Sequence, residues 1–370
     1  MDDETLSALA LARVPGVGPQ AWQRLMAAFG SATDALTAGR SALLAIGLPA
    51  ETVNRLGAPD WAGAEADAGW VAARPEHHLL RVGDPGYPCQ LAEIPDPPPL
   101  LFLRGTPEAL HHPQVALVGS RHATAGGTDL TRHLAGSLAE AGLTVTSGLA
   151  YGIDGAAHRG ALDAGGTTIA VTATGVDRPY PRRHRRLHEA IAEGGAVVSE
   201  QPPGTEPAAA LFPRRNRIIS GLARGVVVVQ AGRRSGALIT ARQAAEQGRE
   251  VFAVPGSVHD PAARGCHALL REGATLVEHA GDVLDEIGWG CPAAAAPPSQ
   301  AAAGAETDEP EERQVLEALG HEPLTLDALR QRSGLTLDRL SSILLTMELK
   351  GLLTAVPGGR YQRRKPEGWK

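Results

Sequence analysis

Four short segments of the chain gather the residues best suited to bind an anion. "VGSRHATAGG" follows a β-branched run at residues 115–119, and "TSGLAYGIDG" follows a second run at 143–147. "FPRRNRIISG" and "RRSGALITAR" stand on either side of a third run at 225–230. Glycine and serine let backbone amides approach a phosphate, and arginine adds a planar charged donor. Because the arginines come from several segments, the pattern favours a run of phosphates over one small anion.

Alternating strands and helices must position these segments. Short β-branched or apolar runs recur, with amphipathic or Ala-rich helical stretches between them, at residues 115–119, 143–147, 167–173, 195–199, 225–230 and 250–256. This alternation predicts an α/β domain over residues 80–288, with a parallel sheet covered on both faces. Ligands on such sheets bind at the carboxyl ends of the strands. We therefore expect the four segments to converge at one edge of the sheet.

A helical domain is predicted in front of the sheet, over residues 1–75. "LALARVPGVGPQAWQRLMAAFG" contains an apolar helix, a tight "PGVG" turn and a second helix, which is the helix-hairpin-helix pattern. The backbone amides of such a hairpin can hold a phosphate. Residues 1–79 nevertheless hold five basic and nine acidic side chains. A DNA contact and a purely structural role both stay open for this domain.

Two further segments follow the sheet. Residues 289–308 are rich in Ala, Pro and acids without apolar periodicity, and we interpret them as a disordered linker. Residues 309–370 predict three helices and two short strands around a "PGG" turn, which is the winged-helix order. The third helix could enter a DNA groove. It carries Asp338 and Glu348 as well as Arg339, with Lys350 after it, so a protein partner is an equal alternative.

Charge is distributed unevenly. The chain has 41 acidic and 35 basic side chains, yet residues 178–234 hold eleven arginines and four acids. A basic patch on a net-acidic protein indicates an anionic partner at one site. A solvated arginine-rich surface is the alternative, because arginine outnumbers lysine 32 to 3 over the chain.

The remaining bulk features indicate a cytoplasmic protein without cofactor or metal. No run of about 18 apolar residues predicts a membrane span, and the acidic N-terminus does not resemble a signal peptide. The three cysteines (Cys89, Cys266 and Cys291) are far apart and indicate neither a disulfide framework nor a zinc site.

The same segments also bear on whether the protein is an enzyme. No G-x-G-x-x-G follows a strand and no G-x-x-x-x-G-K-[ST] occurs, which argues against a dinucleotide cofactor and against P-loop hydrolysis. A nucleotide hydrolase at the sheet edge stays as the alternative function, because Asp154 and Glu200 both follow strands. Asp154 and His158 also have helical i, i+4 spacing suited to acid–base catalysis. The structural alternative is that Asp154 satisfies amides at a helix start while His158 packs one turn later.

The motifs together resemble the DNA processing protein A (DprA) family. "VGSR", "SGLAYGIDGAAHRGAL", "SEQPPG", "FPRRNRIISGLA", "SGALITARQAAEQGREVFAVPG" and "GCHALLREGA" match it in order and spacing over about residues 80–288. The resemblance implies an extended Rossmann-like core, a sterile-alpha-motif-like or helix-hairpin-helix-like domain in front and a winged-helix-like domain behind. It also implies a non-enzymatic homodimer that binds and protects single-stranded DNA in natural transformation and helps to load the recombinase RecA.

The resemblance also assigns site residues. The residues that it implies would face the DNA, by charge or by backbone and hydroxyl donors, are Gly119, Ser120, Arg121, Ser147, Gly148, Arg182, Arg183, Arg185, Arg214, Arg215, Asn216 and Arg217. Two positions depart from the family, since His184 and His267 stand where asparagine is common. Aromatic content is 4%, so stacking platforms are scarce. We expect binding dominated by phosphate contacts, with little sequence preference.

Overall fold

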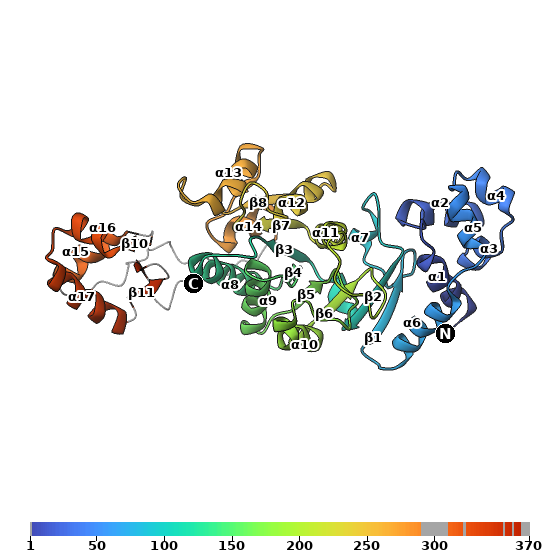
Figure 1. Ribbon diagram of the computed structural model, residues 1–370, viewed down its shortest axis with the longest axis horizontal. Coiled ribbons are helices and arrows are strands. Elements are labelled where there is room, and N and C mark those ends of the chain that lie inside the picture. Colours follow the sequence, from blue (N-terminus) through green and yellow to red (C-terminus); the bar gives the residue numbers. More distant parts are fainter. Residues whose placement is uncertain (1, 290–309, 321–322, 351, 357–358, 364–370) are drawn as a thin grey trace. The chain divides into compact units, whose positions relative to one another are not determined.

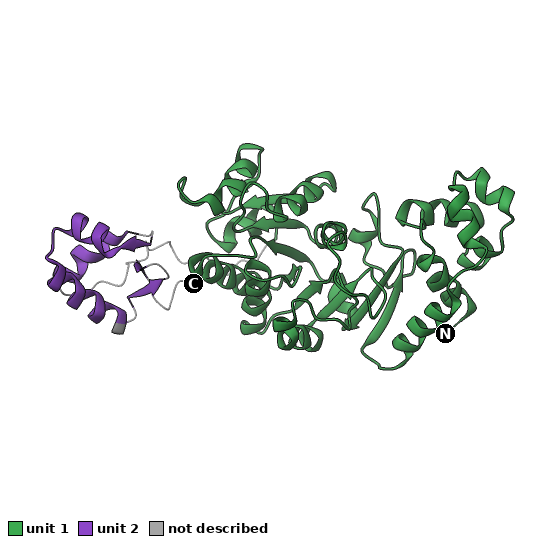
Figure 2. Cartoon of the chain, viewed as in Figure 1, with its two compact units in different colours: residues 1–291 green, residues 292–370 purple. Residues whose placement is uncertain are grey.

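The computed structural model describes residues 2–289, 310–320, 323–350, 352–356 and 359–363. The chain divides into two compact units, residues 1–291 and 292–370 (Figure 2). The predicted linker at 289–308 lies, apart from Trp289, outside the described residues. None of the described helices is long and apolar enough to cross a membrane.

A nine-stranded sheet forms the centre of the first unit (Figure 1). Its strands are β1 (His77–Arg81), β2 (Leu100–Gly105), β3 (Gln114–Val118), β4 (Thr144–Ser147), β5 (Thr168–Val171), β6 (Ala196–Ser199), β7 (Gly225–Val228), β8 (Glu250–Ala253) and β9 (Thr275–Leu276). The spatial order is β1-β2-β6-β5-β4-β3-β7-β8-β9. Pairing is parallel from β6 through β9, whereas β1 and β2 add an antiparallel edge.

The six strands that the sequence predicts, β3 to β8, are confirmed, and the parallel core is confirmed with them. The sequence prediction missed the antiparallel edge. β1 reads "HHLLR" and β2 reads "LLFLRG", so neither contains the β-branched residues that identified the other strands. A short leucine-rich run is equally compatible with a buried helix.

Helices cover both faces of the sheet. One face packs against α8 (Ala125–Glu140), α9 (Ile153–Asp163), α10 (Arg185–Gly194) and α14 (Ala280–Glu286). The other packs against α7 (Cys89–Ala92), α11 (Leu211–Leu222), α12 (Ala237–Glu246) and α13 (Arg264–Arg271). Strand residues alternate between the two cores: Val115 and Leu117 lie in one, Ala116 and Val118 in the other.

Six helices precede the sheet: α1 (Asp3–Arg13), α2 (Pro19–Phe29), α3 (Ala32–Thr37), α4 (Arg40–Ala45), α5 (Ala50–Leu56) and α6 (Trp61–Ala72). The turn between α1 and α2 contains Gly16 at φ +99°, and an added Cβ there would overlap Thr52. The apolar side chains of these helices share one core with Leu100 and Phe102 of β2. The helices are therefore packed onto the antiparallel edge of the sheet.

The second unit confirms the winged-helix order. Its elements are α15 (Pro310–Leu319), β10 (Leu324–Thr325), α16 (Leu326–Ser333), α17 (Leu337–Leu349), β11 (Leu353–Val356) and β12 (Arg360–Arg363). The three helices and β11 enclose a small leucine-rich core. Pro357 and Gly358 of the predicted turn lie outside the described residues.

Candidate nucleic-acid interface

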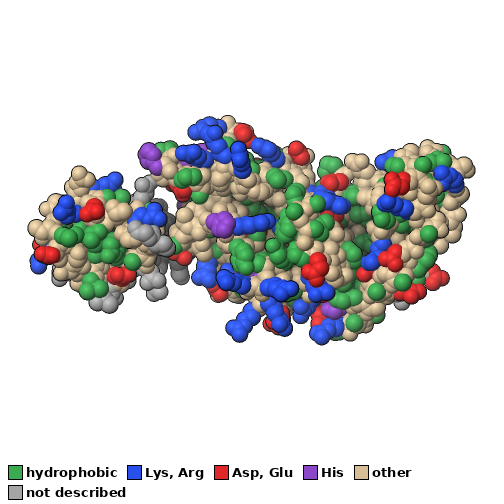
Figure 3. Space-filling model, in the orientation of Figure 1, with side chains coloured by type: hydrophobic (Ala, Val, Ile, Leu, Met, Phe, Trp, Pro, Cys, Tyr) green, Lys and Arg blue, Asp and Glu red, His purple; other side chains and the backbone are tan. Residues whose placement is uncertain are grey.

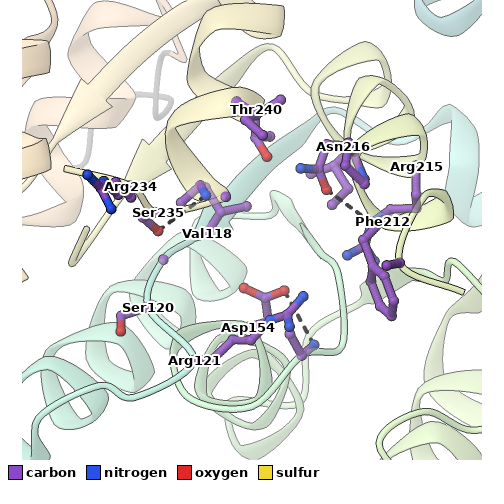
Figure 4. Close-up of a pocket in the computed structure, with 18 of the residues that line it drawn as sticks. Val118, Ser120, Arg121, Asp154, Phe212, Arg215, Asn216, Arg234, Ser235 and Thr240 are labelled. Carbon is purple, nitrogen blue, oxygen red and sulfur yellow. Dashed lines mark hydrogen bonds between the residues drawn. The ribbon is translucent and has the colours of Figure 1, made fainter. Parts of the chain in front are cut away.

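A cleft of about 860 Å³ opens at the carboxyl ends of β3 and β7. The chain leaves β3 toward α8 on one face and leaves β7 toward α12 on the other. Such a reversal creates the crevice in which open α/β sheets bind ligands. The lining includes residues from the ends of both strands and from α9, α11 and α12, among them Gly119, Ser120, Arg121, Asp154, Phe212, Arg215, Asn216, Arg234, Ser235 and Thr240 (Figure 4).

Glycines let the cleft walls come close together. A Cβ on Gly119 would lie 2.6 Å from the Ile153 side chain and 2.9 Å from the Gln230 carbonyl oxygen. A Cβ on Gly152, which has φ +72°, would lie 2.2 Å from the Ser120 carbonyl oxygen. The first turn of α9 therefore packs directly beneath the segment that carries Arg121.

Five of the predicted arginines are exposed: Arg121, Arg182, Arg183, Arg185 and Arg214. Among the ion pairs of the described residues, only Arg185 of this set has an acidic partner, Glu189 at 3.1 Å. The Arg121 guanidinium lies 5.2 Å from the ring centre of Phe212. Lys and Arg side chains gather over α10 in the space-filling view (Figure 3). Four of these five arginines therefore present their charge to solvent without an ion pair among the described residues.

Arg215 does not face outward as expected. The segment "FPRRNRIISG" is helical, within α11, and Arg215 is 5% exposed. Its Nη1 donates to the Gly148 carbonyl oxygen at 2.7 Å and to the Val171 carbonyl oxygen, which joins the ends of β4 and β5. Burial lowers the pKa of Arg215 to about 10, partly offset by Asp154, so the group stays charged at neutral pH. Its position indicates a structural role at the cleft wall.

Arg217 is also inside the protein, at 4% exposure. It donates to the Glu200 carboxylate at 2.7 Å and to the Asp96 carboxylate at 2.9 Å. The Glu200 side chain is 7% exposed. Arg217 therefore anchors α11 to the end of β6 and to the segment before β2, and its charge is already matched within the protein.

Ser147 and Gly148 also depart from the expected position. Ser147 is fully buried, and its Oγ donates to the Leu117 carbonyl oxygen at 2.6 Å. Gly148 is buried against Arg215, and a Cβ there would lie 2.5 Å from the guanidinium. Neither residue lines the cleft. Ser120 does line it, although its amide already donates to the Gln230 carbonyl oxygen at 2.7 Å, so its hydroxyl is the donor left.

Asp154 is the acid that lines the cleft. It is 6% exposed and accepts from the Ala150 amide at 3.3 Å. Burial raises the pKa of Asp154, while the charges of Arg215 and Arg121 oppose that shift. Glu200 is committed to Arg217 instead.

His158 is not part of an acid–base pair in the cleft. It is fully buried, and its Nδ1 lies 2.7 Å from the Thr168 hydroxyl. That hydroxyl donates to the Val145 carbonyl oxygen at 2.6 Å, so Nδ1–H must be the donor to Thr168. The buried Nε2 has no hydrogen-bond partner among the residues that the structure describes. Burial therefore lowers the pKa of His158 to about 3, which supports the structural interpretation of this residue.

Comparison with known proteins decides the family. Residues 78–288 match the family described as DNA recombination-mediator protein A, residues 2–38 match the DprA-like N-terminal HHH domain, and residues 294–359 match the DprA winged helix domain. The chain belongs to the DprA family. It is 42% identical to Protein Smf of Escherichia coli over 81% of each chain. It is 49% identical to DNA processing protein DprA of Streptococcus pneumoniae over 55% of this chain and 72% of that one.

Solved structures of DprA proteins share the fold. The crystal structure of DprA from Streptococcus pneumoniae matches 77% of this chain and 98% of that chain, with 38% identity and a TM-score of 0.67. A structure of DprA from Helicobacter pylori, described as revealing a unique single-stranded DNA binding mode, matches 57% of this chain and 95% of that chain, with 28% identity and a TM-score of 0.52.

His184 and His267 each bond to a backbone carbonyl. The Nδ1 of His184 lies 3.0 Å from the Leu149 carbonyl oxygen and must donate to it. Leu149 has φ +56° in the turn between β4 and α9, so this bond supports a backbone conformation that L-residues rarely adopt. The Nε2 of His267 lies 3.0 Å from the Gly256 carbonyl oxygen. Both histidines therefore support loops at the carboxyl end of the DprA sheet.

The site prediction omitted several residues that line the cleft. Arg234, Ser235 and Thr240 come from the start of α12 and the loop before it, and Asp154 comes from α9. The sequence signal for Arg234 and Ser235 was available, because "RRSG" follows β7 as "GSR" follows β3. Thr240 carries no such signal, since it lies within a helix.

The two cations at the third helix of the DprA winged-helix unit are paired with acids of α15. Arg339 of α17 lies 2.9 Å from Glu311, and Lys350 lies 2.7 Å from Glu312. Leu337 and Leu345 on the same helix are 45% and 61% exposed. In contrast to the exposed arginines beside the cleft, the cations at this helix have acidic partners, and the helix also exposes leucine side chains.

Proposed function

We propose that this DprA protein binds single-stranded DNA along the carboxyl edge of its sheet and acts as a recombination mediator. The observation that carries the proposal is the set of exposed arginines beside the cleft, four of which (Arg121, Arg182, Arg183 and Arg214) form no ion pair with another described residue. Such a set fits the phosphates of a nucleic-acid strand, because several separated cations match a row of phosphates better than they match a single anion. The DNA-binding description of the Helicobacter pylori relative supports the same assignment.

We propose fewer residues as phosphate contacts than the sequence predicted. Arg121, Arg182, Arg183, Arg185 and Arg214 are exposed, and Gly119, Ser120 and Asn216 line the cleft between them. Arg215 and Arg217 position this surface instead, since their donors are bonded within the protein. Ser147 and Gly148 are buried behind the cleft and support it from within the protein.

A salt titration with Arg121→Ala/Arg214→Ala tests this proposal. Binding of a fluorescent dT oligonucleotide should weaken as salt rises, with a log–log slope of about −0.7 per phosphate contact. The double variant should lose about tenfold or more in affinity and about 1.4 in slope, because two contacts are removed. Arg74→Ala, an exposed arginine outside the cleft, serves as the matched control. Unchanged affinity and slope in the double variant would place the site elsewhere.

We further propose that the protein acts as a homodimer that protects the bound strand and helps to deliver it to RecA, as the family resemblance implies, in the cytoplasm. The proposed role is binding without catalysis. Nucleotides incubated with the protein should then show no turnover, and product formation would favour the nucleotide hydrolase. Sedimentation at micromolar concentration should give a dimer, and a monomer there would contradict that part.

A further inference from the structure

Two arginines outside the cleft lie on the face of the sheet that α8, α9 and α10 cover. Arg132 of α8 is exposed, and Arg159 of α9 is half-buried. Neither lines the cleft, and neither forms an ion pair with another described residue. The three helices are neighbours, because α9 packs against both α8 and α10 (Figure 1). Pairing within the protein therefore does not account for these two charges.

Two glycines of α9 bring the arginines close to each other and to the start of α10. A Cβ on Gly160 would lie 2.3 Å from the Arg132 carbonyl oxygen, so α8 and α9 are in contact at this point. A Cβ on Gly155 would lie 2.7 Å from the His184 ring and 3.2 Å from the Arg159 guanidinium. The side chains of Arg159 and His184 therefore converge over the first turn of α9.

The charges of Arg159 and Arg132 are close enough to affect each other. Burial lowers the pKa of Arg159, and the charge of Arg132 lowers it further, while Asp163 opposes the shift. The Arg159 Nη1 donates to the Gly155 carbonyl oxygen at 3.0 Å, which leaves the other donors of the guanidinium available. Two cations that repel each other in this way are stabilised by an anion that lies near both.

An exposed tyrosine connects this pair of arginines to the cleft. Tyr151 is 43% exposed in the turn before α9, and its ring meets the His184 ring edge-on at 5.3 Å between centres. The next residue is Gly152, which packs beneath the segment that carries Arg121. A series of groups thus leads from the cleft to α8. We call it the lateral surface, and its members in order are Arg121, Tyr151, His184, Arg159 and Arg132.

We propose that the bound strand leaves the cleft across the lateral surface, with phosphates on Arg159 and Arg132 and one base stacked on Tyr151. Grooves that bind single strands combine cations along the backbone with aromatic rings on which bases stack, and the lateral surface has both. The inference rests on the proposed DNA binding and adds the path of the strand beyond the cleft. It also adds two phosphate contacts that the motifs of the sequence did not indicate.

The α12–α13 side of the cleft offers a different exit. It also carries exposed arginines, Arg242 and Arg271. Among the described residues from 77 to 289, the exposed aromatic side chains are Tyr151 and Tyr180. They lie in the segments that enter α9 and α10, respectively. Because base stacking adds to phosphate contacts when a single strand binds, these aromatic residues favour the exit over α9.

Oligonucleotides of two lengths test the inference. A dT strand of about 6 nucleotides should occupy the cleft, whereas a strand of about 20 should also reach the lateral surface. Arg132→Gln/Arg159→Gln removes both charges and keeps a donor for the Gly155 carbonyl oxygen. This variant should bind the long strand about tenfold more weakly, with a salt slope smaller by about 1.4, because two phosphate contacts are lost. It should bind the short strand within about twofold of the unaltered protein, which also shows that the variant is folded.

The other outcomes separate the path from the proposed DNA binding. Unchanged affinity for the long strand would overturn the path, and so would an equal loss at both lengths. If the unaltered protein bound neither strand, the proposed DNA binding would fail as well. Arg242→Gln/Arg271→Gln is the matched control, since it removes two exposed arginines from α12 and α13. A length-dependent loss in this control alone would place the exit on that side and overturn the inference.

The stacking contact is tested at Tyr151. Tyr151→Ala should weaken binding of the long strand by about fivefold, whereas Tyr151→Phe, which keeps the ring, should stay within about twofold. A long strand of abasic sugar phosphates should bind Tyr151→Ala and the unaltered protein equally, because it has no base to stack. A loss in Tyr151→Ala that persists on the abasic strand would overturn the stacking.

An acidic peptide tests the other class of partner that two exposed cations could attract. An oligoglutamate peptide should bind no more weakly to Arg132→Gln/Arg159→Gln than to the unaltered protein. If the double substitution weakened peptide binding but not binding of the long strand, the lateral surface would be a protein-docking site, and the inference would be overturned.

Discussion

Arg214 and Arg215 are adjacent in α11 and have opposite surroundings. Arg214 is exposed and has no ion pair among the described residues, whereas Arg215 is 5% exposed and bonded to the ends of β4 and β5. Arg217, two residues further on, is buried between Glu200 and Asp96. Arginines of one helix therefore lie in two regions at this edge of the sheet. Arg214 belongs to an exposed rim, and Arg215 and Arg217 form the buried base beneath it. The number of arginines in a segment therefore measures neither the charge that reaches solvent nor the number of contacts that a ligand can make.

The largest effect that tests this comparison is expected at the buried base. Arg217→Ala should lower the free energy of unfolding by about 3–5 kcal/mol, because Glu200 would remain buried without a partner. Urea denaturation measures the change. Arg217→Met/Glu200→Leu should recover most of the loss, since it removes both charges. A folded Arg217→Ala protein of normal stability that no longer binds DNA would instead make Arg217 a rim residue.

The next largest effect is expected from acid, which should lower the free energy of unfolding through two buried histidines. Burial lowers the pKa of His158 to about 3 and the pKa of His188 to about 4, both below the ordinary 6.5. The unfolded chain therefore takes up protons first as pH falls, so this stability is present above pH 6.5 and is lost progressively toward the folded pKa values. Between pH 7 and pH 5, each histidine should cost on the order of 2 kcal/mol.

Urea denaturation at several pH values measures that loss, with His188→Asn as the comparison. The variant should show the shallower pH dependence, because one of the two groups no longer titrates. Parallel pH profiles for the variant and the unaltered protein would contradict the assignment of the acid sensitivity to His188.

The smallest effect is expected in the winged-helix unit. Arg339→Ala removes an exposed ion pair with Glu311, which should change the free energy of unfolding by less than about 1 kcal/mol. Because that arginine is already paired, the affinity for single-stranded DNA should stay within about twofold in the same salt titration. A loss as large as that of the rim variant would show that α17 contributes phosphate contacts after all.

The sequence predicted the strands of the parallel core but not the depth of each arginine. β-branched runs identify β3 to β8 because packing on both faces of a sheet selects such residues. The partners that bury Arg217 are 17 and 121 residues away in the chain, so no local pattern could reveal them. The same limit applies to Ser147, whose hydroxyl is taken by a carbonyl 30 residues earlier. Residue type and strand end predicted the location of the cleft, while tertiary contacts decided which residues reach it.

The antiparallel edge of the sheet has a consequence for how the protein is made. β2 pairs with β6, which the ribosome adds about 90 residues later. At a synthesis rate of about 5–20 residues per second, β2 waits on the order of 5–20 s for that neighbour. During this interval β1 can already pair with one side of β2, while the other side and the buried residues Leu101 and Leu103 lack their final cover. A nascent chain that ends before β6 therefore exposes an unpaired side of β2, which is the kind of feature through which chains aggregate.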